Sequence, residues 1–193
     1  MPDLLPPADA PRVPAVDRAV RLIDALAASH EPLALAELAR RSFAATYAPT
    51  HDAARIRIHC DSVLGDAEVG RWFEAGAAQI VLAESGAELL GFVQWQAAAA
   101  PVPARHAIEL KRLYVDTAAQ GSGLGQRLFD AVRADAKRVG ADLLWLCVYA
   151  GNERARRFYV RQGMTAIGRV PYRFVDQVED DLALGLDPGM VTP

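Results

Sequence analysis

The chain has 193 residues, of which 52% are hydrophobic and 23% are charged, and its formal net charge is −3 at pH 7. This composition is typical of a folded globular protein, and the length is sufficient for one sizeable core. It excludes a disordered chain, and the small negative charge provides no general attraction to nucleic acid or to an anionic membrane.

The first residues are rich in proline and precede the predicted fold. Five of the twelve prolines lie within residues 2–14, so we expect residues 1–16 to form an extended leader. No basic region followed by an apolar stretch is found there, and no apolar run approaches the roughly 18 residues that cross a membrane. We therefore predict a cytoplasmic protein with no membrane partner. A single domain is predicted over 17–187, followed by a tail of 188–193.

The first part of the predicted domain contains one strand followed by helices. The alternation in RAVRLIDAL predicts a strand over 18–26. The segment 29–49 predicts a helix with Ser29 as its N-cap, Pro32 in its first turn and Pro49 beyond its end. Two further helical segments follow, over 50–65 and 66–76.

The second part of the domain is rich in strands. Three β-rich runs cover 78–84, 88–97 and 105–116, the first two separated by the hairpin signal SGA. Apolar residues then recur near helical spacing from Leu124 to Val139, and Gly140 ends that helix. The apolar run 142–150 is typical of a central strand, 152–163 predicts a short helix, and strands over 164–174 and 176–186 close the domain. This order predicts an α/β fold with one mixed sheet.

The stretch LKRLYVDTAAQGSGLGQRLFDAV, residues 110–132, joins a predicted strand to a predicted helix through a loop with three glycines. The glycines follow neither the GxxxxGK[ST] pattern of a P-loop nor the GxGxxG pattern of a dinucleotide fold, which disfavours both kinds of nucleotide site. Free N–H groups at the start of the helix, with no Cβ close by, still suit an anionic diphosphate. A turn whose glycines only provide a positive φ is the simpler alternative.

Two segments together resemble the signature of the GNAT acyl-CoA N-acetyltransferases. The first is Gln120-x-x-Gly123-x-Gly125 after LYVD, and the second is NERARRFYVRQGM, some 30 residues later. The resemblance extends over roughly residues 19–186. It implies a GNAT-like, mostly antiparallel sheet flanked by helices with splayed central strands, acetyl-CoA as co-substrate and no metal ion.

By this resemblance, the strand and the glycine loop bind the cofactor. Main-chain groups of Leu113 and Val115, with Tyr114 between them, are expected to pair with the pantetheine arm. The loop amides are expected to hold the pyrophosphate of CoA. The loop residues concerned are Gln120, Gly121, Ser122, Gly123, Leu124, Gly125 and Gln126.

The second segment is expected to complete the site. Asn152, Ala155 and Tyr159 lie at i, i+3 and i+7, on one face of the predicted helix. The resemblance implies that Asn152 contacts the pantetheine arm, that Ala155 and Phe158 pack around the cofactor, and that Tyr159 is the general acid for the leaving thiolate. Packing in the core is the alternative for Tyr159.

Glu109 is the candidate general base. It lies six residues before Val115, where histone-acetylating members of the family carry their base. Strand alternation predicts that it shares a face with Lys111, Leu113 and Val115, from which a carboxylate can reach the acceptor directly or through one water. An ion pair with Lys111 or Arg112 is the alternative. The N–H of Leu113 is the candidate donor to the thioester oxygen.

The acceptor is expected to be an amine, on a small molecule or a peptide. The segments RRSFAATYAPTHDAARI and RVPYRFVDQVEDDLALGL resemble the PaiA-like branch of the family, which acetylates polyamines. Peptide N-termini, lysine side chains and aminoglycosides are the other acceptors considered. Acidic residues can form a negative mouth with aromatic walls, or simply a solvated surface: Glu109, Asp176, Glu179, Asp180 and Asp181, with Tyr47, Trp72 and Tyr172.

The remaining reactive side chains predict neither a metal site nor a nucleophile. Cys60 and Cys147 are far apart and without a CxxC pattern, which predicts buried reduced thiols. No histidine has a cysteine or carboxylate at ligand spacing, and His30, His51, His59 and His106 are predicted to be surface or core residues. A homodimer through sheet edges is one arrangement that the C-terminal hairpin allows. A CoA-binding sensor without turnover is the alternative function.

Overall fold

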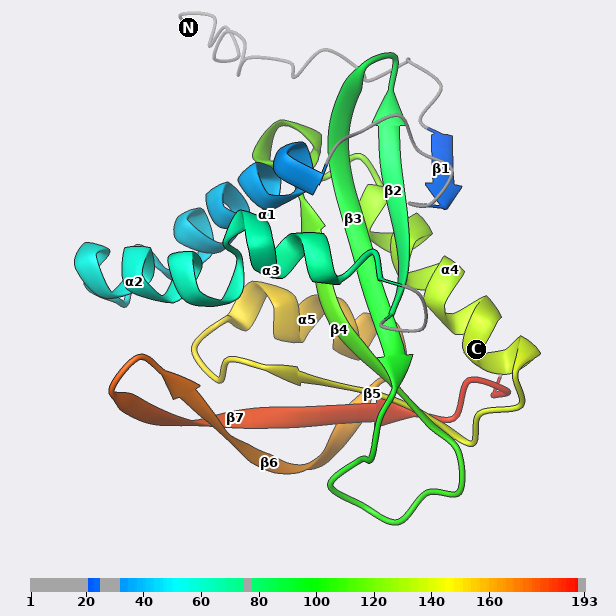
Figure 1. Ribbon diagram of the computed structural model, residues 1–193. Helices are drawn as coiled ribbons and strands as arrows, with labels where there is room; N and C mark the ends of the chain where they lie inside the picture. The colour runs from blue at the N-terminus through cyan, green and yellow to red at the C-terminus, as the bar shows by residue number, and fades with distance from the viewer. Residues whose placement is uncertain (1–20, 25–31, 75–77, 191–193) are drawn as a thin grey trace, which may run out of the picture.

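The computed structural model describes residues 21–24, 32–74 and 78–190. These residues contain one seven-stranded sheet in the order β1-β2-β3-β4-β5-β7-β6, with helices on both faces (Figure 1). Among the described strands only β4 and β5 pair in parallel, so the predicted mixed and mostly antiparallel sheet is confirmed. The predicted leader and the cap at Ser29 lie outside the described residues, and the domain limits stay predictions.

The elements follow the predicted order. The strands are β1 (Arg21–Asp24), β2 (Gln79–Ser85), β3 (Glu88–Ala97), β4 (Ala107–Val115), β5 (Leu143–Val148), β6 (Thr165–Phe174) and β7 (Gln177–Leu186). The helices are α1 (Pro32–Tyr47), α2 (Ala53–Val63), α3 (Asp66–Arg71), α4 (Leu124–Arg138) and α5 (Glu153–Arg161), with a short 3-10 helix, η2 (Thr117–Ala119). As the prolines predicted, α1 begins at Pro32 and ends before Pro49.

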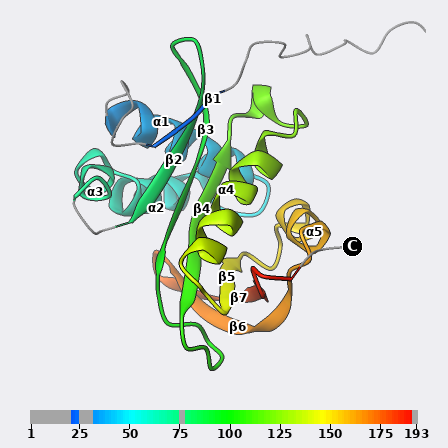
Figure 2. The same ribbon diagram turned by 90° about the vertical axis from the view of Figure 1, so that its right-hand side faces the viewer.

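The sheet separates two hydrophobic clusters, and Figure 2 shows it between α1–α3 on one side and α4–α5 on the other. The apolar stripe of α4, including Leu128, Phe129 and Val132, is fully buried against the sheet, as its helical spacing predicts. The opposite cluster joins α1–α3 to Phe92 and Phe174. We call these the α4 cluster and the α1 cluster.

A bulge interrupts β4 at its centre. Gln94 of β3 pairs with Arg112, but the next residue, Trp95, pairs with Leu110, so that Lys111 is an extra residue without a partner on β3. Such a bulge inverts the alternation of side chains along the strand that carries it.

The bulge decides which side chains of β4 face the cofactor side of the sheet. Leu110 before it, and Leu113 and Val115 after it, all pack in the α4 cluster, whereas Tyr114 packs in the α1 cluster. Because Glu109 is next to Leu110, its side chain lies on the α1 side. The prediction that Glu109 shares a face with Leu113 and Val115 is therefore wrong.

β4 and β5 separate after a short paired region. Ala107–Glu109 pair with Leu143–Trp145, and the two strands then separate, β4 continuing beside β3 to Val115 and β5 beside β7 to Val148. The predicted splay of the central strands is confirmed, with Glu109 at its vertex (Figure 1). In the described part of the chain, the edge of β4 beyond the vertex has no strand partner.

A buried carboxyl group of β7 lacks a hydrogen-bond partner at one of its oxygens in the described part of the chain. Asp181 of β7 is 5% exposed, and its Oδ1 has no hydrogen-bond partner among the described residues. Burial, assisted by the negative charges of Glu179 and Asp180, raises the pKa of Asp181 to about 6. Its ionised form therefore opposes folding, because a buried charge loses its hydration and gains no partner.

Replacement of Asp181 by asparagine should change stability in a pH-dependent way. Because folding raises the pKa of Asp181 from 3.8 to about 6, the folded state binds the additional proton between these pH values. The loss of stability caused by the ionised Asp181 is thus fully present above pH 6. It disappears as the pH falls towards 3.8, the pKa of this group in the unfolded state. The gain in free energy of unfolding from Asp181→Asn should be about 1–3 kcal/mol larger at pH 8 than at pH 4.5, measured by urea denaturation.

The matched control is Asp180→Asn, which removes the same charge from the next residue. Asp180 is exposed and lies 2.9 Å from Arg169, so its replacement should have a similar, small effect at both pH values. If the effect of Asp181→Asn is also equal at both, Asp181 is not an uncompensated buried acid.

Candidate functional site

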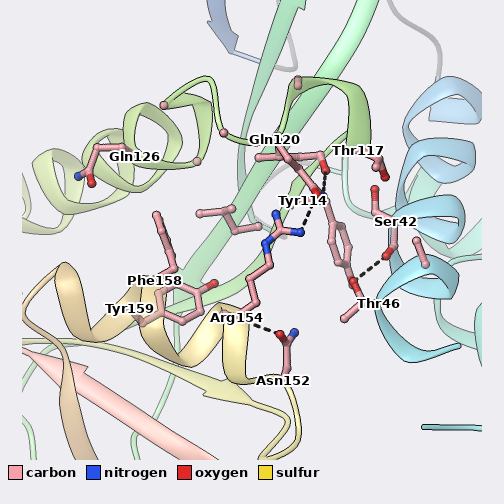
Figure 3. A pocket seen from close by; sticks show the side chains of 18 of the residues that line it. Ser42, Thr46, Tyr114, Thr117, Gln120, Gln126, Asn152, Arg154, Phe158 and Tyr159 are labelled. Carbon is pink, nitrogen blue, oxygen red and sulfur yellow. Dashed lines mark hydrogen bonds between the residues drawn. The ribbon is translucent and has the colours of Figure 1, made fainter. Parts of the chain in front are cut away.

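A cavity of about 750 Å³ lies between the end of β4, the glycine loop, α1 and α5 (Figure 3). This volume is within the range of about 300–1,000 Å³ that is usual for small-molecule sites. The cavity is lined by most of the predicted cofactor residues: Leu113, Tyr114, Val115, Gln120, Gly121, Gly123, Gly125, Gln126, Asn152, Ala155, Phe158 and Tyr159. Residues that are far apart in the sequence, and were predicted to act together, are therefore brought together.

Two predicted loop residues do not line the cavity. Leu124 is buried in the α4 cluster, and the hydroxyl of Ser122 donates a hydrogen bond of 2.6 Å to the carbonyl oxygen of Ala119. Their predicted role involved only main-chain amides, and that role stays a prediction.

The glycine loop leaves the start of α4 open. Gly123 occupies the N-cap position with φ +84°, and no side chain caps the helix. A Cβ on Gly121 or Gly123 would meet no atom within 4 Å, so the space in front of the first helical amides is free. An uncapped helix N-terminus at a cavity suits an anionic group, because its N–H groups and the helix dipole both favour negative charge.

Hydrogen bonds tie the loop to β4 and α5. The Gln120 side chain donates to the carbonyl oxygen of Val115 at 3.1 Å and accepts from Arg154 at 2.5 Å. Asn152 caps α5, since its Oδ1 accepts from the N–H of Ala155 at 3.1 Å. One lone pair of the Asn152 oxygen is thus used within the helix, and the amide NH2 group and the second lone pair are left for a ligand.

Several lining residues were missed by the sequence analysis. Three come from α1, opposite α5 in Figure 3, and the others from η2 and α5: Ser42, Ala45 and Thr46, then Thr117, Arg154, Arg161 and Gln162. Thr46 lies in the segment that resembles the PaiA-like branch, and this was the one signal for α1. The two arginines bring positive charge to the cavity, which suits an anionic ligand.

Tyr159 lies at the inner end of the cavity. It is buried between Phe129 and Phe158, whose ring centroids are 6.2 and 5.1 Å from its own. Its hydroxyl forms no hydrogen bond within the described part of the chain. Burial raises the pKa of Tyr159, so the group stays protonated near neutral pH and can act as a proton donor.

Glu109 is buried at the vertex with both of its oxygens engaged. Lys111 Nζ lies 3.1 Å from Oε1, and the Gln96 amide donates to Oε2 at 3.3 Å. The alternative ion pair considered for Glu109 is therefore present. Neither oxygen can take a proton from an acceptor without weakening one of these contacts.

The predicted acidic mouth separates into residues of different kinds. Asp176 and Asp180 are exposed partners of Arg55 and Arg169, as expected of a solvated surface. Glu179 instead accepts a hydrogen bond of 2.7 Å from His51. Of these four acids only Asp181 is buried, and its Oδ1 lacks such a partner among the described residues.

The predicted aromatic walls are only partly realised. Trp72 is buried in the α1 cluster, and the guanidinium of Arg112 already lies 4.1 Å from its ring centroid. Trp72 is therefore a core residue rather than a wall for an amine, because an internal cation covers it. Tyr47 and Tyr172 are half-buried; burial is the main cause that raises the pKa of both, and the charge of Asp181 contributes.

Two histidines belong to this side of the sheet. His51 contacts Phe174 with a centroid separation of 4.6 Å, and His59 Nε2 lies 2.9 Å from the Tyr172 hydroxyl. Their partners are more than 100 residues away, so no local pattern in the sequence could indicate these contacts. Burial lowers the pKa of His59, which keeps it neutral near pH 7.

The described residues contain no group of three or more histidine, cysteine or acidic side chains that could hold a metal ion. Both cysteines are free; Cys60 is buried as predicted, whereas Cys147 is partly exposed. None of the described helices is both long and apolar enough to span a bilayer.

Known proteins share this fold and parts of this sequence. An uncharacterized N-acetyltransferase of Lactobacillus delbrueckii subsp. lactis is 30% identical over 77 residues, and one of Mycobacterium tuberculosis is 34% identical over 77 residues. Each match covers 40% of this chain, with 44% of the first relative and 49% of the second. The chain thus matches less than half the length of these curated relatives.

Solved structures match over a longer part of the chain. The PaiA N-acetyltransferase of Thermoplasma acidophilum, solved in complex with coenzyme A, has a TM-score of 0.70 at 18% identity and covers 88% of this chain and 99% of its own. A GCN5-related N-acetyltransferase of Rhodopseudomonas palustris has a TM-score of 0.67 at 16% identity, over 88% of this chain and 95% of its own. These likenesses show a common fold.

Two family models match the sequence. One describes the IclR helix-turn-helix domain and matches residues 15–42, but the described residues of that stretch form strand β1 and most of α1 of the present fold. The other describes the acetyltransferase (GNAT) family and matches residues 34–164, which is more than half of the chain. The chain therefore belongs to the GNAT family of acetyltransferases.

Proposed function

We propose that this protein is an acetyl-CoA-dependent N-acetyltransferase, in which a neutral primary amine attacks the thioester directly and no covalent enzyme intermediate forms. One observation carries the proposal. A single cavity contains the unpaired edge of β4, the uncapped start of α4 and the hydroxyl of Tyr159. These are the three features that a long, anionic thioester cofactor requires.

The cofactor arm fits along β4. Beyond the vertex, Leu113 and Val115 face the cavity side of the sheet, and the edge of the strand there has no partner among the described strands. The amide groups of a pantetheine arm can add to such an edge as a short strand does. The diphosphate then lies at the start of α4, where Gly121 and Gly123 leave the space open.

In the proposed reaction, the amine nitrogen replaces the sulfur of CoA on the acetyl group. The acceptor ammonium loses one proton to become a neutral amine, whose lone pair forms the new C–N bond while the C–S bond breaks. The N–H of Leu113 donates to the oxygen that becomes negative in the transition state. Tyr159 gives its proton to the leaving thiolate and is then reprotonated from the proton that the amine releases. The products are the acetamide, CoA and one proton.

Glu109 lies where it can act on the acceptor rather than on the cofactor. Its position at the vertex is on the α1 side, whereas Leu113 and Tyr159 pack on the α4 side. The opening between β4 and β5 connects these two faces. With Lys111 and Gln96 already bound to Glu109, we propose that it positions water or the acceptor and accepts a proton only when Lys111 moves away.

The proposed acceptor is a polyamine or another small amine. Support comes from the half-buried aromatic and acidic groups around β6 and β7, and from the segments that resemble the PaiA-like branch. An amine at a protein N-terminus or on a lysine side chain is the alternative, which the acceptor panel below separates. The cytoplasmic location and the homodimer stay predictions.

Gly125→Ala should weaken acetyl-CoA binding without weakening the fold. A Cβ here would make ordinary contacts, 3.7 Å from Phe158 and 3.9 Å from Val115, and both of these side chains line the cavity. The added methyl group should raise the dissociation constant of acetyl-CoA by about 10-fold, measured by titration calorimetry. The free energy of unfolding should stay equal or rise by up to about 1 kcal/mol, because alanine favours the helix.

Gly70→Ala is the matched control. Gly70 lies within α3, away from the cavity, and a Cβ there would meet nothing within 4 Å. It should have the same effect on helix stability with no effect on affinity. If Gly125→Ala binds acetyl-CoA as tightly as Gly70→Ala, the cofactor does not lie against the start of α4.

Thiol release from acetyl-CoA with a panel of amines tests the function itself. The wild-type protein should release CoA with at least one primary amine. Tyr159→Phe should reduce kcat by about 10²–10⁴-fold, the usual contribution of a general acid, with little change in the dissociation constant of acetyl-CoA. The buried ring is retained, so the fold should be unaffected.

Other outcomes separate the alternatives. An unchanged kcat in Tyr159→Phe leaves this residue as packing only. Binding of acetyl-CoA without thiol release from any amine supports a CoA sensor in place of an enzyme. Absence of acetyl-CoA binding contradicts both.

A further inference from the structure

Asp181 belongs to a polar group on the α1 side of the sheet, whereas Tyr159 packs on the α4 side. We define this group as Asp181 and Glu179 of β7, Tyr172 of β6, Tyr47 of α1 and His51, and call it the β7 subsite. His51 Nε2 lies 2.7 Å from Glu179 Oε1, the ring centroids of Tyr47 and His51 are 5.2 Å apart, and Tyr172 pairs with Glu179 across β6 and β7. Asp181 lies two residues after Glu179 on β7, so the two carboxyls share a face of the strand.

The side chain of Asp181 faces the acceptor side of the sheet. Leu182, the next residue, packs in the α4 cluster, so Asp181 points to the other face, as Glu109 does. Cys147 of β5 lies on the same face, because Leu146 and Val148 on either side of it pack in the α4 cluster. Burial raises the pKa of its thiol to about 11, and the charges of both Glu109 and Asp181 contribute. Both buried carboxyls thus point to the same face of the sheet.

The two buried acids differ in what they bind. Glu109 has a lysine and an amide as partners, and the exposed acids nearby are paired with arginines. Glu179 is engaged by His51. Asp181 Oδ1 is buried with no partner among the described residues. Asp181 is therefore the buried acid on this face whose Oδ1 is left for a ligand that carries a positive charge.

The surroundings of Asp181 suit an organic cation. The rings of Tyr47 and Tyr172 are half-buried, and Tyr47 lies in a group of rings with Tyr149 at a centroid distance of 5.5 Å and Phe43 at 4.2 Å. Aromatic faces attract ammonium groups, and a carboxylate away from bulk water attracts them more strongly than an exposed one.

Asp181 is too far from the reacting centre to bind the attacking nitrogen. Val148 at the end of β5 pairs with Leu182, so that Asp181 lies across β5 from β4, beyond the opening. Two strand spacings place the main chain of β7 about 10 Å from that of β4, where Leu113 is the oxyanion donor that we propose, and the splay adds to this. A nitrogen held by Asp181 is therefore a second one.

We propose that Asp181 binds a positively charged group of the acceptor that lies away from the reacting amine, and thereby selects acceptors with a second cation. This inference rests on the proposed acetyltransferase function and assigns to one residue of β7 the selectivity of that same site.

Three acceptors of equal length test the proposal. They carry one primary amine and differ only at the other end: 1,4-diaminobutane is positive there, 4-aminobutan-1-ol is neutral and 4-aminobutanoate is negative. Wild type should have its highest kcat/KM with the diamine. In Asp181→Asn the ratio of kcat/KM for the diamine to that for the amino alcohol should fall by about 10- to 100-fold, the usual effect of a charged hydrogen bond.

Asp180→Asn is the matched control for charge. Its side chain is exposed and paired with Arg169, and the variant removes one negative charge from the adjacent position. It should retain the wild-type ratio. A fall in this ratio as large as that in Asp181→Asn would show that the general field of β7, rather than Asp181, selects the cation, and would overturn the proposal.

Binding without turnover gives a second, independent measurement. At pH 8, 1,4-diaminobutane should raise the thermal unfolding temperature of wild type, and of Asp180→Asn, more than 4-aminobutan-1-ol does, and Asp181→Asn should lose this difference. If no amine causes thiol release but the Asp181-dependent shift is present, the enzyme function fails and the cation site stands.

Two further results would contradict the proposed role of Asp181. An equal loss of kcat/KM for all three acceptors in Asp181→Asn would place Asp181 at the reacting amine or in the fold, and would overturn the proposal. Absence of any preference for the diamine in wild type, in both rate and thermal shift, would overturn it as well.

Discussion

The separation of β4 from β5 after Glu109 and Trp145 is the constraint on which the site depends. A fully paired sheet would have no passage between its faces, and each main-chain group of β4 would be bonded to a neighbour. Beyond the point of separation, Leu113 and Val115 of β4 pack in one cluster with Phe158 and Tyr159 of α5, and all four side chains line the cavity. The hydrophobic core that stabilises the domain therefore also forms a wall of the cavity.

The bulge at Lys111 gives the two faces of the opening different chemistry. Without the extra residue, Glu109 and Leu113 would point the same way, and the acidic group would lie on the cofactor side, next to an anionic ligand. With it, the oxyanion donor and the proton donor lie on the α4 side, whereas Glu109 and Asp181 lie on the α1 side. Negative charge is thus kept away from the diphosphate and towards the acceptor, as electrostatics favours for a cationic amine.

The sequence predicted the elements that local patterns determine. The periodic apolar residues of α4, the prolines around α1 and the glycines of the loop each imply their structure within a few residues. The bulge was not predictable, because Lys111 and Arg112 interrupt the apolar alternation and fit either register. Contacts such as Arg112 with Trp72, or His51 with Glu179, join segments that no periodicity relates, so they required the fold.

Asp181 shows why a binding residue can be costly to the free protein. Asp180, one residue away, is exposed to water and paired with Arg169. Such a pair adds little to stability, and the carboxylate needs no ligand to balance its charge. Asp181 is buried, and its Oδ1 has no hydrogen-bond partner among the described residues. Its negative charge is therefore energetically unfavourable, which raises its pKa. A bound cation removes that cost at the moment of binding, whereas a neutral group of equal size does not. Discrimination between acceptors then arises from the unfavourable free energy of the buried Asp181 charge in the free protein. An arginine of the protein beside Asp181 would abolish both this unfavourable free energy and the preference for a cationic acceptor.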